Sequence, residues 1–255
     1  MILEDFHVHT TFSDGINSPE EMVRAALKMG LKRIGFSDHA HTPEGEDYCM
    51  SYENIPVYRS TIGELKEKYR GKIEIFCGIE QDLYSDVPTD GYDYVIASVH
   101  SIKQGDHYYD VDDTEARFLD LVDRFYDGDY IRMAEDYFEN VSHLGAISPN
   151  IIGHVDLVTK FNEGDRLFDT HDPRYLAAVK RAVDALLPTG AAFEINTGAI
   201  SRKRRTSPYP SDEILRYIVS RGGKLVFSGD AHSAETLCYQ FERWKRYFRD
   251  SGILM

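Results

Sequence analysis

Histidines and carboxylates recur at corresponding positions along this chain, and these two side-chain types commonly bind transition metals. The chain has ten histidines. His7 and His9 form an H-x-H pair close to the N-terminus. Similar candidates end or follow other short apolar runs: Asp14, Asp38, His39, Glu80, His100, His154, Asp156, Asp230 and His232. A lone histidine is more often solvated or hydrogen-bonded than a ligand, but this repeated placement predicts a metal cluster.

The donor types indicate which metals and which chemistry to expect. Imidazole and carboxylate groups without thiolates suit zinc, manganese or iron. The candidates are too many for one tetrahedral ion, so we expect two to three divalent transition-metal ions. A shared carboxylate would bridge two of them, and clustered ions are typical of enzymes that act on phosphate esters.

These side chains can form one site only if the fold brings the ends of several strands together. Seven short runs rich in Ile, Val or Phe read as strands buried on both faces, at residues 2–9, 33–38, 73–80, 94–100, 151–156, 191–196 and 224–230. Helices are predicted between them, at residues 19–29, 57–69, 114–144 with a break at 127–129, 172–187, 211–221 and 234–250. Ser18 and Glu21 form the capping-box pattern that starts the first helix, and Gly30 stops it.

Strands that alternate with helices predict an α/β fold with a parallel sheet. The short final connections favour a closed or nearly closed barrel over an open, doubly wound sheet. A conventional barrel has eight strands, whereas seven are found here. In such a barrel the C-terminal strand ends share one face, so the distant candidates would meet in one pocket. We expect a single domain over residues 1–255.

Composition excludes several classes of function. The 255 residues carry a formal charge of −14, which argues against nucleic acid as a partner. A phosphorylated small molecule remains compatible, because bound metals make a site locally positive. The three cysteines and the absence of an apolar leader predict a cytoplasmic protein without a membrane partner. The pattern leaves the oligomeric state open, a homo-oligomer included.

Six motifs together resemble the polymerase-and-histidinol-phosphatase (PHP) superfamily: His7-Val-His9 with Asp14-Gly15, Ser37-Asp38-His39, Gly78-Ile79-Glu80, Ser98-Val99-His100, Gly153-His154-Val155-Asp156 and Ser228-Gly229-Asp230-Ala231-His232. Their order and spacing match over nearly the whole chain. The Ser13-Asp14-Gly15 segment and the Glu194-Ile195-Asn196 segment are similar to those of the stand-alone histidinol phosphate phosphatases.

The resemblance implies a distorted seven-stranded (β/α) TIM-like barrel and a three-metal centre. One ion would bind His7, His9, Glu80 and Asp230. A second would share Glu80 and add His100 and His154. A third would bind Asp14, His39 and His232; some relatives have a histidine in the region of Asp14. The implied reaction is hydrolysis of histidinol phosphate in histidine biosynthesis, and we expect a hydroxide that bridges two metals to attack phosphorus.

Other residues are candidates for acid catalysis and substrate binding. Asp38 and Asp156 could protonate the leaving alcohol, or could instead orient the neighbouring imidazoles. Lys160 and Arg202 follow the fifth and sixth predicted strands and are candidates for binding phosphate. The loops at residues 41–53 and 104–113, rich in Tyr, Asp and Glu, could close over a cationic amino alcohol or be ordinary solvated loops.

Three functional hypotheses follow. The first is a histidinol-phosphatase. The second is another phosphoesterase of the superfamily, such as a nucleotide phosphatase, a phosphodiesterase or a protein-tyrosine phosphatase. The third is a non-enzymatic metal-binding module, which the full set of candidate ligands disfavours.

Overall fold

Seven parallel strands form one sheet in the computed structural model, which describes residues 3–43, 45 and 47–254. The strands are β1 (Glu4–Asp5), β2 (Arg33–Phe36), β3 (Glu74–Asp82), β4 (Tyr94–Ser98), β7 (Ile151–Ile152), β8 (Ala192–Asn196) and β9 (Lys224–Ser228). Their order in the sheet is the order in which they occur along the chain. Each connection therefore returns the chain to the same end of the sheet.

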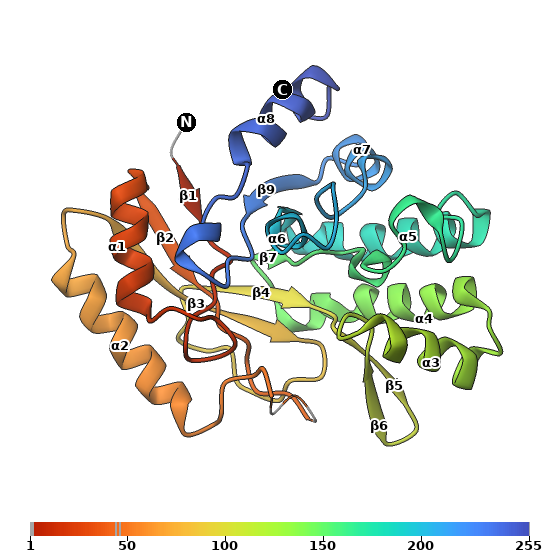
Figure 1. Cartoon of the computed structure of the whole chain (residues 1–255), viewed down its shortest axis with the longest axis horizontal. Helices are drawn as coiled ribbons and strands as arrows, with labels where there is room; N and C mark the ends of the chain where they lie inside the picture. Colours follow the sequence, from red (N-terminus) through yellow and green to blue (C-terminus); the bar gives the residue numbers. More distant parts are fainter. Residues whose placement is uncertain (1–2, 44, 46, 255) are drawn as a thin grey trace.

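The sheet nearly closes on itself just beyond β1 and β9 (Figure 1). Val8 and Ala231 form a parallel bridge there. The amide of Ala231 donates to the carbonyl of His7 at 2.9 Å, and the amide of His9 donates to the carbonyl of Ala231 at 2.9 Å. The predicted barrel is thus confirmed, with closure made by one bridge beyond the short strand β1.

Helices surround the sheet, with α1 and α2 at one side and α3, α4 and α5 at the other (Figure 1). The helices are α1 (Pro19–Met29), α2 (Asn54–Lys68), α3 (Glu115–Tyr126), α4 (Tyr130–Ser142), α5 (Pro173–Leu186), α6 (Gly198–Ser201), α7 (Asp212–Ser220) and α8 (Phe241–Asp250). Short 3₁₀ turns cover His143–Ile147, Leu157–Thr159, Glu163–Asp165, Leu187–Thr189 and Ala234–Thr236. None of the helices in the described residues has the length and apolar character needed to cross a membrane.

Local sequence explains the helix boundaries that were predicted correctly. Ser18 and Glu21 make the reciprocal capping box of α1, and Gly30 ends that helix in a left-handed conformation with φ 81°. The predicted break after α3 is also present. Asp127 ends α3 with φ 53°, and Asp129 caps α4 by accepting from the amide of Arg132 at 2.9 Å.

Several predicted elements differ from the structure, among them the strand predicted at residues 151–156, of which β7 covers only Ile151–Ile152. Of the strand predicted at residues 2–9, β1 forms only at Glu4–Asp5, and residues 1 and 2 lie outside the described residues. The last helix begins at Phe241, because left-handed turns at Cys238 and Gln240 precede it. The predicted loop at 104–113 contains part of an antiparallel hairpin, β5 (Ser101–Gln104) and β6 (His107–Asp110), which reverses at Gly105 with φ 63°. A glycine followed by Asp106 is a hairpin turn signal.

An aromatic cluster fills the barrel interior below the strand ends. The ring of Phe6 lies 5.2 Å from that of Phe76 and 5.5 Å from that of Tyr94. The buried hydroxyl of Tyr94 lies 2.7 Å from the carbonyl oxygen of Phe6 and can donate to it. A Cβ on Gly78 would come within 2.3 Å of the Tyr94 ring. Glycine at this position therefore makes room for the ring.

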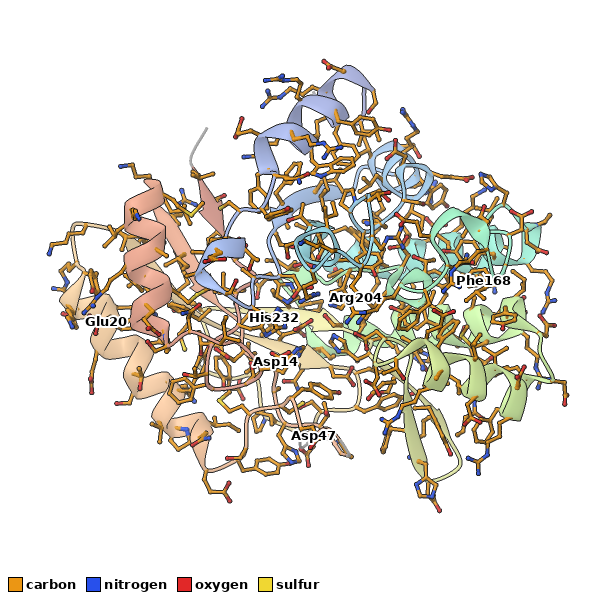
Figure 2. The ribbon with its side chains drawn as sticks, in the orientation of Figure 1. Asp14, Glu20, Asp47, Phe168, Arg204 and His232 are labelled. Carbon is orange, nitrogen blue, oxygen red and sulfur yellow. The ribbon has the colours of Figure 1, made fainter. Side chains whose placement is uncertain are left out.

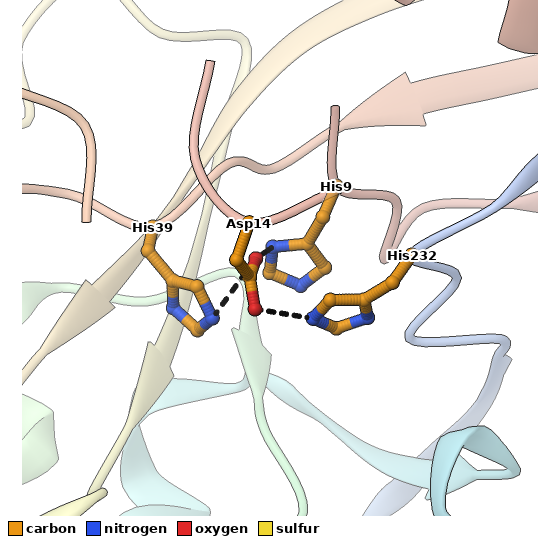
Figure 3. A group of neighbouring side chains, drawn as sticks. All are labelled: His9, Asp14, His39 and His232. Carbon is orange, nitrogen blue, oxygen red and sulfur yellow. Dashed lines mark ion pairs between the residues drawn. The ribbon is translucent and has the colours of Figure 1, made fainter. Parts of the chain in front are cut away.

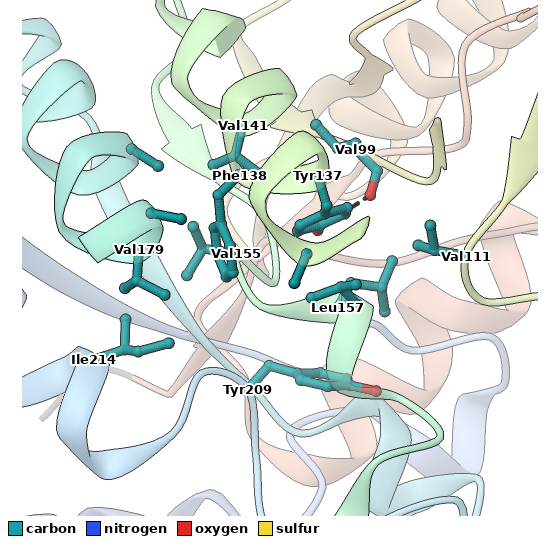
Figure 4. Packing of buried hydrophobic residues seen from close by; sticks show 14 of the residues in the cluster. Val99, Val111, Tyr137, Phe138, Val141, Val155, Leu157, Val179, Tyr209 and Ile214 are labelled. Carbon is teal, nitrogen blue, oxygen red and sulfur yellow. Dashed lines mark hydrogen bonds between the residues drawn. The ribbon is translucent and has the colours of Figure 1, made fainter. Parts of the chain in front are cut away.

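A larger apolar cluster joins the outer helices to the sheet. Tyr137, Phe138 and Val141 on α4 pack with Val179 on α5 and Ile214 on α7 (Figure 4). Full burial of such side chains stabilises the fold by about 1.5–3 kcal/mol each. The result is a rigid scaffold that holds the strand ends in fixed positions.

Candidate metal centre

The C-terminal strand ends bring the predicted metal-binding side chains together. His7 and His9 flank the bridge residue Val8, Glu80 lies in β3, and the others follow strands or adjoining turns: Asp14, His39, His100, His154, Asp230 and His232. Figure 2 shows Asp14 and His232 near the middle of the molecule, although 218 positions separate them in the sequence (232 − 14). The convergence expected from the strand pattern is present.

Glu80 is the carboxylate at the centre of the cluster. Its Oε2 lies 3.1 Å from His7 Nε2, 3.5 Å from His9 Nε2 and 3.0 Å from His39 Nδ1. Its Oε1 lies 3.1 Å from His154 Nε2 and 3.6 Å from His100 Nε2. Both oxygens therefore face imidazole nitrogens, which is the arrangement that a bridging carboxylate needs.

A second carboxylate, Asp14, gathers three imidazoles at the rim (Figure 3). Its Oδ2 lies 2.9 Å from His232 Nε2, and its Oδ1 lies 3.5 Å from His9 Nδ1 and 3.9 Å from His39 Nε2. These four residues offer donor atoms that all lie within 4.8 Å of one another. The third ligand set implied by the resemblance is thus brought together, with His9 added to it.

The other ligand sets are brought together with two differences. His7, His9 and Asp230 form one group of close donor atoms, without the Glu80 that the resemblance also implies for the first ion. Glu80 groups with His7 and His154, and separately with His39 and His100. The expected second set, in which Glu80, His100 and His154 act together, is therefore divided between two groups, although the His100 and His154 rings lie only 5.0 Å apart.

Backbone conformation at the end of β9 positions Asp230. The residue adopts a left-handed φ of 45°, so the chain turns before His232 and does not continue as the predicted strand. A Cβ on Gly198 would lie 2.7 Å from the Asp230 side chain. Only a glycine at the start of α6 lets the carboxylate occupy this position.

Unpartnered donor atoms indicate that the cluster fits metal ions. Both ring nitrogens of His9, the Nε2 of His7 and the Oε2 of Glu80 are buried and have no hydrogen-bond partner among the described residues. An unpaired buried polar atom costs about 1–3 kcal/mol. Coordination to cations would satisfy His7 Nε2, Glu80 Oε2 and one ring nitrogen of His9, whose other nitrogen carries the proton of a neutral imidazole. The mixture of nitrogen and oxygen donors suits zinc, manganese or iron.

The charges within the cluster depend strongly on one another. Burial lowers the pKa of His9, and the neighbouring His232 and His39 lower it further, to well below its usual range. Burial acts to lower the pKa of His7, but the charges of Glu194 and Glu80 outweigh it and raise this pKa well above the usual value. Burial opposes ionisation of Glu80, yet the surrounding imidazoles hold its pKa well below the usual range. The carboxylate is therefore ready to bind a cation.

Sequence reasoning missed two carboxylates that hold the imidazoles. Glu194 Oε1 accepts from His7 Nδ1 at 2.7 Å, and Asp82 Oδ2 lies 3.2 Å from His100 Nδ1. Carboxylates in this position orient a metal-binding imidazole and increase its basicity. A signal was available in both cases, because Glu194 interrupts a buried apolar strand and Asp82 follows Glu80 at the two-residue spacing of one strand face.

The two candidate acids are located away from the open part of the site. Asp38 is fully buried and accepts hydrogen bonds from the amide of Thr10 at 2.7 Å and the hydroxyl of Ser13 at 2.7 Å. Burial raises its pKa to about 6. Asp156 is also buried and accepts from the amide of Ser211 at 3.0 Å. Both carboxylates thus hold neighbouring loops, and none of these contacts joins them to an imidazole.

A cavity of about 330 Å³ opens onto the cluster. Asp14, His39, Glu80, His100, His154, Asp230 and His232 line it, and so do both predicted substrate-binding residues, Lys160 and Arg202. Arg202 Nη2 lies 3.0 Å from Asp230 Oδ2, and its Nη1 lies 2.7 Å from His232 Nδ1. Lys160 Nζ lies 3.1 Å from Asp112 Oδ2. A phosphate bound at the cluster would thus lie near two positively charged side chains, those of Arg202 and Lys160.

The other basic residues of the same loop are placed differently. Arg205 donates to the Thr159 carbonyl at 3.0 Å and stacks over Tyr209, with its Cζ 4.5 Å from the ring centroid. Lys203 and Arg204 are exposed and line a neighbouring surface pocket. Within the described residues, Arg202 is the member of the run that reaches the cavity.

Comparison with known proteins agrees with this geometry. A family model described as the PHP domain matches residues 5–198. The histidinol-phosphatase of Bacillus subtilis (strain 168) is 28% identical over 263 aligned residues, which cover 93% of this chain and 96% of that protein.

Two solved structures share the fold. A Listeria monocytogenes protein provisionally assigned as a histidinol phosphatase superposes with a TM-score of 0.80 at 18% identity, covering 94% of this chain and 99% of that one. The histidinol phosphate phosphatase of Lactococcus lactis subsp. lactis Il1403, solved with zinc, L-histidinol and phosphate, superposes with a TM-score of 0.67 at 22% identity, covering 98% and 94%.

Proposed function

The chain belongs to the PHP domain family, and on that premise we propose that it is a metal-dependent phosphatase that hydrolyses histidinol phosphate to histidinol and phosphate. The observation that carries the reaction type is the cluster of imidazoles around Glu80, which opens onto a cavity lined by Arg202 and Lys160. The substrate is assigned from the curated histidinol-phosphatase that resembles this chain over nearly its full length.

Each part of the site has a distinct task in this proposal. Bound divalent ions would supply a hydroxide nucleophile near neutral pH and offset the charge of the phosphate. Arg202, held by Asp230 at 3.0 Å, directs guanidinium protons to the phosphate oxygens. Lys160 adds a second positive charge. Glu194 and Asp82 keep the Nδ1 atoms of His7 and His100 occupied, which leaves the opposite nitrogens free to bind cations.

We propose two or three ions, drawn from zinc, manganese and iron. Four groups of close donor atoms share His7, His9, His39 and Glu80 among them. Sharing limits how many ions can bind at once, because each nitrogen binds one ion. An ion in the outer group, which contains Asp14, would be the most accessible to solvent, because the Asp14 side chain is 30% exposed.

We also propose a single catalytic domain over residues 1–255, located in the cytoplasm. One sheet includes strands from Glu4 to Ser228, which supports a single unit. The cysteines Cys49, Cys77 and Cys238 are all free thiols, as is usual for proteins of a reducing compartment.

Metal analysis combined with phosphate release tests the proposal. The purified protein is expected to contain at least two transition-metal ions per chain and to release phosphate from histidinol phosphate far faster than from nucleoside monophosphates or phosphotyrosine. Chelation should abolish the activity, and added metal should restore it. An active preparation with fewer than two ions per chain would rule out the cluster mechanism, and equal rates on all substrates would rule out the assigned substrate.

A further inference from the structure

Carboxylates line one wall of the cavity, on the side where the β5–β6 hairpin meets the barrel. Three of them, Asp110, Asp112 and Asp113, lie at the end of the hairpin and just beyond it. Asp112 Oδ2 is paired with Lys160 Nζ at 3.1 Å, and Asp113 Oδ2 is paired with Arg117 Nη1 at 2.8 Å. Asp110 forms no ion pair with any Lys, Arg or His among the described residues.

The backbone holds Asp110 close to the metal cluster. Asp110 pairs with Ser101 in the hairpin ladder, and the next residue, Val111, donates its amide to the carbonyl of His100 at 2.8 Å. The hydroxyl of Ser101 donates to Asp110 Oδ1 at 2.6 Å. The carboxylate is therefore fixed one residue pair away from His100, while its second oxygen has no hydrogen-bond donor among the described residues.

An aromatic side chain also marks this wall as a place for a ligand. Tyr48 lines the same cavity, with its ring centroid 5.3 Å from that of His39. Burial raises the pKa of Tyr48 and the charge of Asp110 raises it further, so the two side chains lie near one another. An aromatic face beside an unpaired carboxylate is a favourable environment for an organic cation.

The electrostatic cost of leaving Asp110 unpaired supports the same conclusion. Burial raises the pKa of Asp110, and the nearby charge of Asp112 raises it further, although the Ser101 hydrogen bond acts against both. A bound ammonium group would pair with the carboxylate and remove this cost. Arg202 cannot do so in its present position, because it is bound to Asp230 and His232.

We propose that Asp110 determines substrate specificity by binding the positively charged amine of a phosphomonoester whose phosphate lies on the metal cluster. This inference rests on the proposed phosphatase function and extends it by assigning the substrate class to one residue. An amino alcohol phosphate, in which two carbons separate the amine from the ester oxygen, carries its positive charge close to the phosphate, and Asp110 lines the same cavity as the cluster. A neutral or anionic phosphomonoester would leave Asp110 unpaired.

The test compares Asp110→Asn with the parent enzyme on two substrates, histidinol phosphate and p-nitrophenyl phosphate. Loss of a charge-assisted hydrogen bond should lower kcat/KM for histidinol phosphate about 10-fold to 100-fold, mostly through KM. The value for p-nitrophenyl phosphate, which has no amine, should stay within about twofold. Asp120→Asn, an exposed substitution on the neighbouring helix α3, should change neither value.

Two further measurements keep the outcome unambiguous. Asp110→Lys should shift the preference toward a phosphomonoester that carries a carboxylate. The inhibition constant of L-histidinol should rise in Asp110→Asn by the same factor as KM. An equal loss on both substrates would overturn the proposal, because it would mean that Asp110 only supports the hairpin. No loss on either would also overturn it.

If the proposed phosphatase function is wrong, the experiment gives a different result from those above. In that case the metal-loaded parent enzyme would hydrolyse neither substrate. Calorimetric titration of L-histidinol into the parent chain and into Asp110→Asn would still measure the amine contact directly, and equal affinities would contradict it.

Discussion

Glu194 and His7 form a hydrogen-bonded pair inside the barrel, with Glu194 Oε1 2.7 Å from His7 Nδ1. Because an ionised carboxylate only accepts, the proton lies on Nδ1. The opposite nitrogen, Nε2, is left without a hydrogen-bond partner and lies 3.1 Å from Glu80 Oε2. This pair of residues thus decides which nitrogen of the His7 ring is available to a metal.

Glu194→Gln should weaken metal binding without removing a predicted ligand. The amide cannot hold the Nδ1 proton as firmly as the carboxylate, so metal affinity should fall about 10-fold to 100-fold. Competition with a chromophoric zinc chelator measures the change. Glu139→Gln, at an exposed site on α4, serves as the control. Unchanged affinity in Glu194→Gln would show that the pair has only a packing role.

Arg202→Gln should impair phosphate binding. Its guanidinium lies at the cavity edge and is held by Asp230 at 3.0 Å. Removing a charge-assisted contact costs about 1.5–3 kcal/mol, so KM for the substrate should rise about 10-fold to 100-fold. The inhibition constant of inorganic phosphate should rise in parallel. Arg204→Gln, which alters an exposed neighbour, should leave both unchanged. A fall in kcat with KM constant would instead place Arg202 in the chemical step.

Asp38→Asn should distinguish an orienting residue from a general acid. Asp38 is fully buried and holds the loop that carries Asp14 through Thr10 and Ser13. We therefore expect equal losses of activity on an alkyl phosphate and on p-nitrophenyl phosphate, whose leaving group needs no proton. The same comparison applies to Asp156→Asn. A much larger loss on the alkyl ester would identify the substituted residue as the acid.

Gly78→Ala should destabilise the barrel. The new Cβ would lie 2.3 Å from the buried Tyr94 ring, and overpacking of this kind costs about 1–3 kcal/mol. For a chain of this size the melting temperature should fall by about 2–4 °C per kcal/mol. Gly63→Ala in α2 is the matched control, because nothing lies within 4 Å of its Cβ. There the helix should be stabilised by about 1 kcal/mol. Equal melting temperatures would contradict the packing described for Tyr94.

Much of the architecture could be predicted from local patterns. The apolar runs that became β2, β3, β4, β8 and β9, the cap at Ser18 and the break near Asp127 each depend on neighbours in sequence. Local patterns failed where distant contacts decide the outcome. The strand predicted at residues 2–9 is interrupted because side chains occupy its backbone groups. The amide of His7 donates to Asp5 Oδ1 at 3.3 Å, and the carbonyl of Phe6 accepts from the hydroxyl of the distant Tyr94 at 2.7 Å.

Residue types and their spacing were enough to predict a cluster of imidazoles and carboxylates on one face of a barrel, because parallel strands align their C-terminal ends. Tertiary structure alone decided how the members are arranged. Glu80 lies among five histidines, His9 joins the group around Asp14, and Glu194 and Asp82 support imidazoles more than ten positions away. Such contacts depend on the angles and distances between strands, and no spacing within a single segment encodes them.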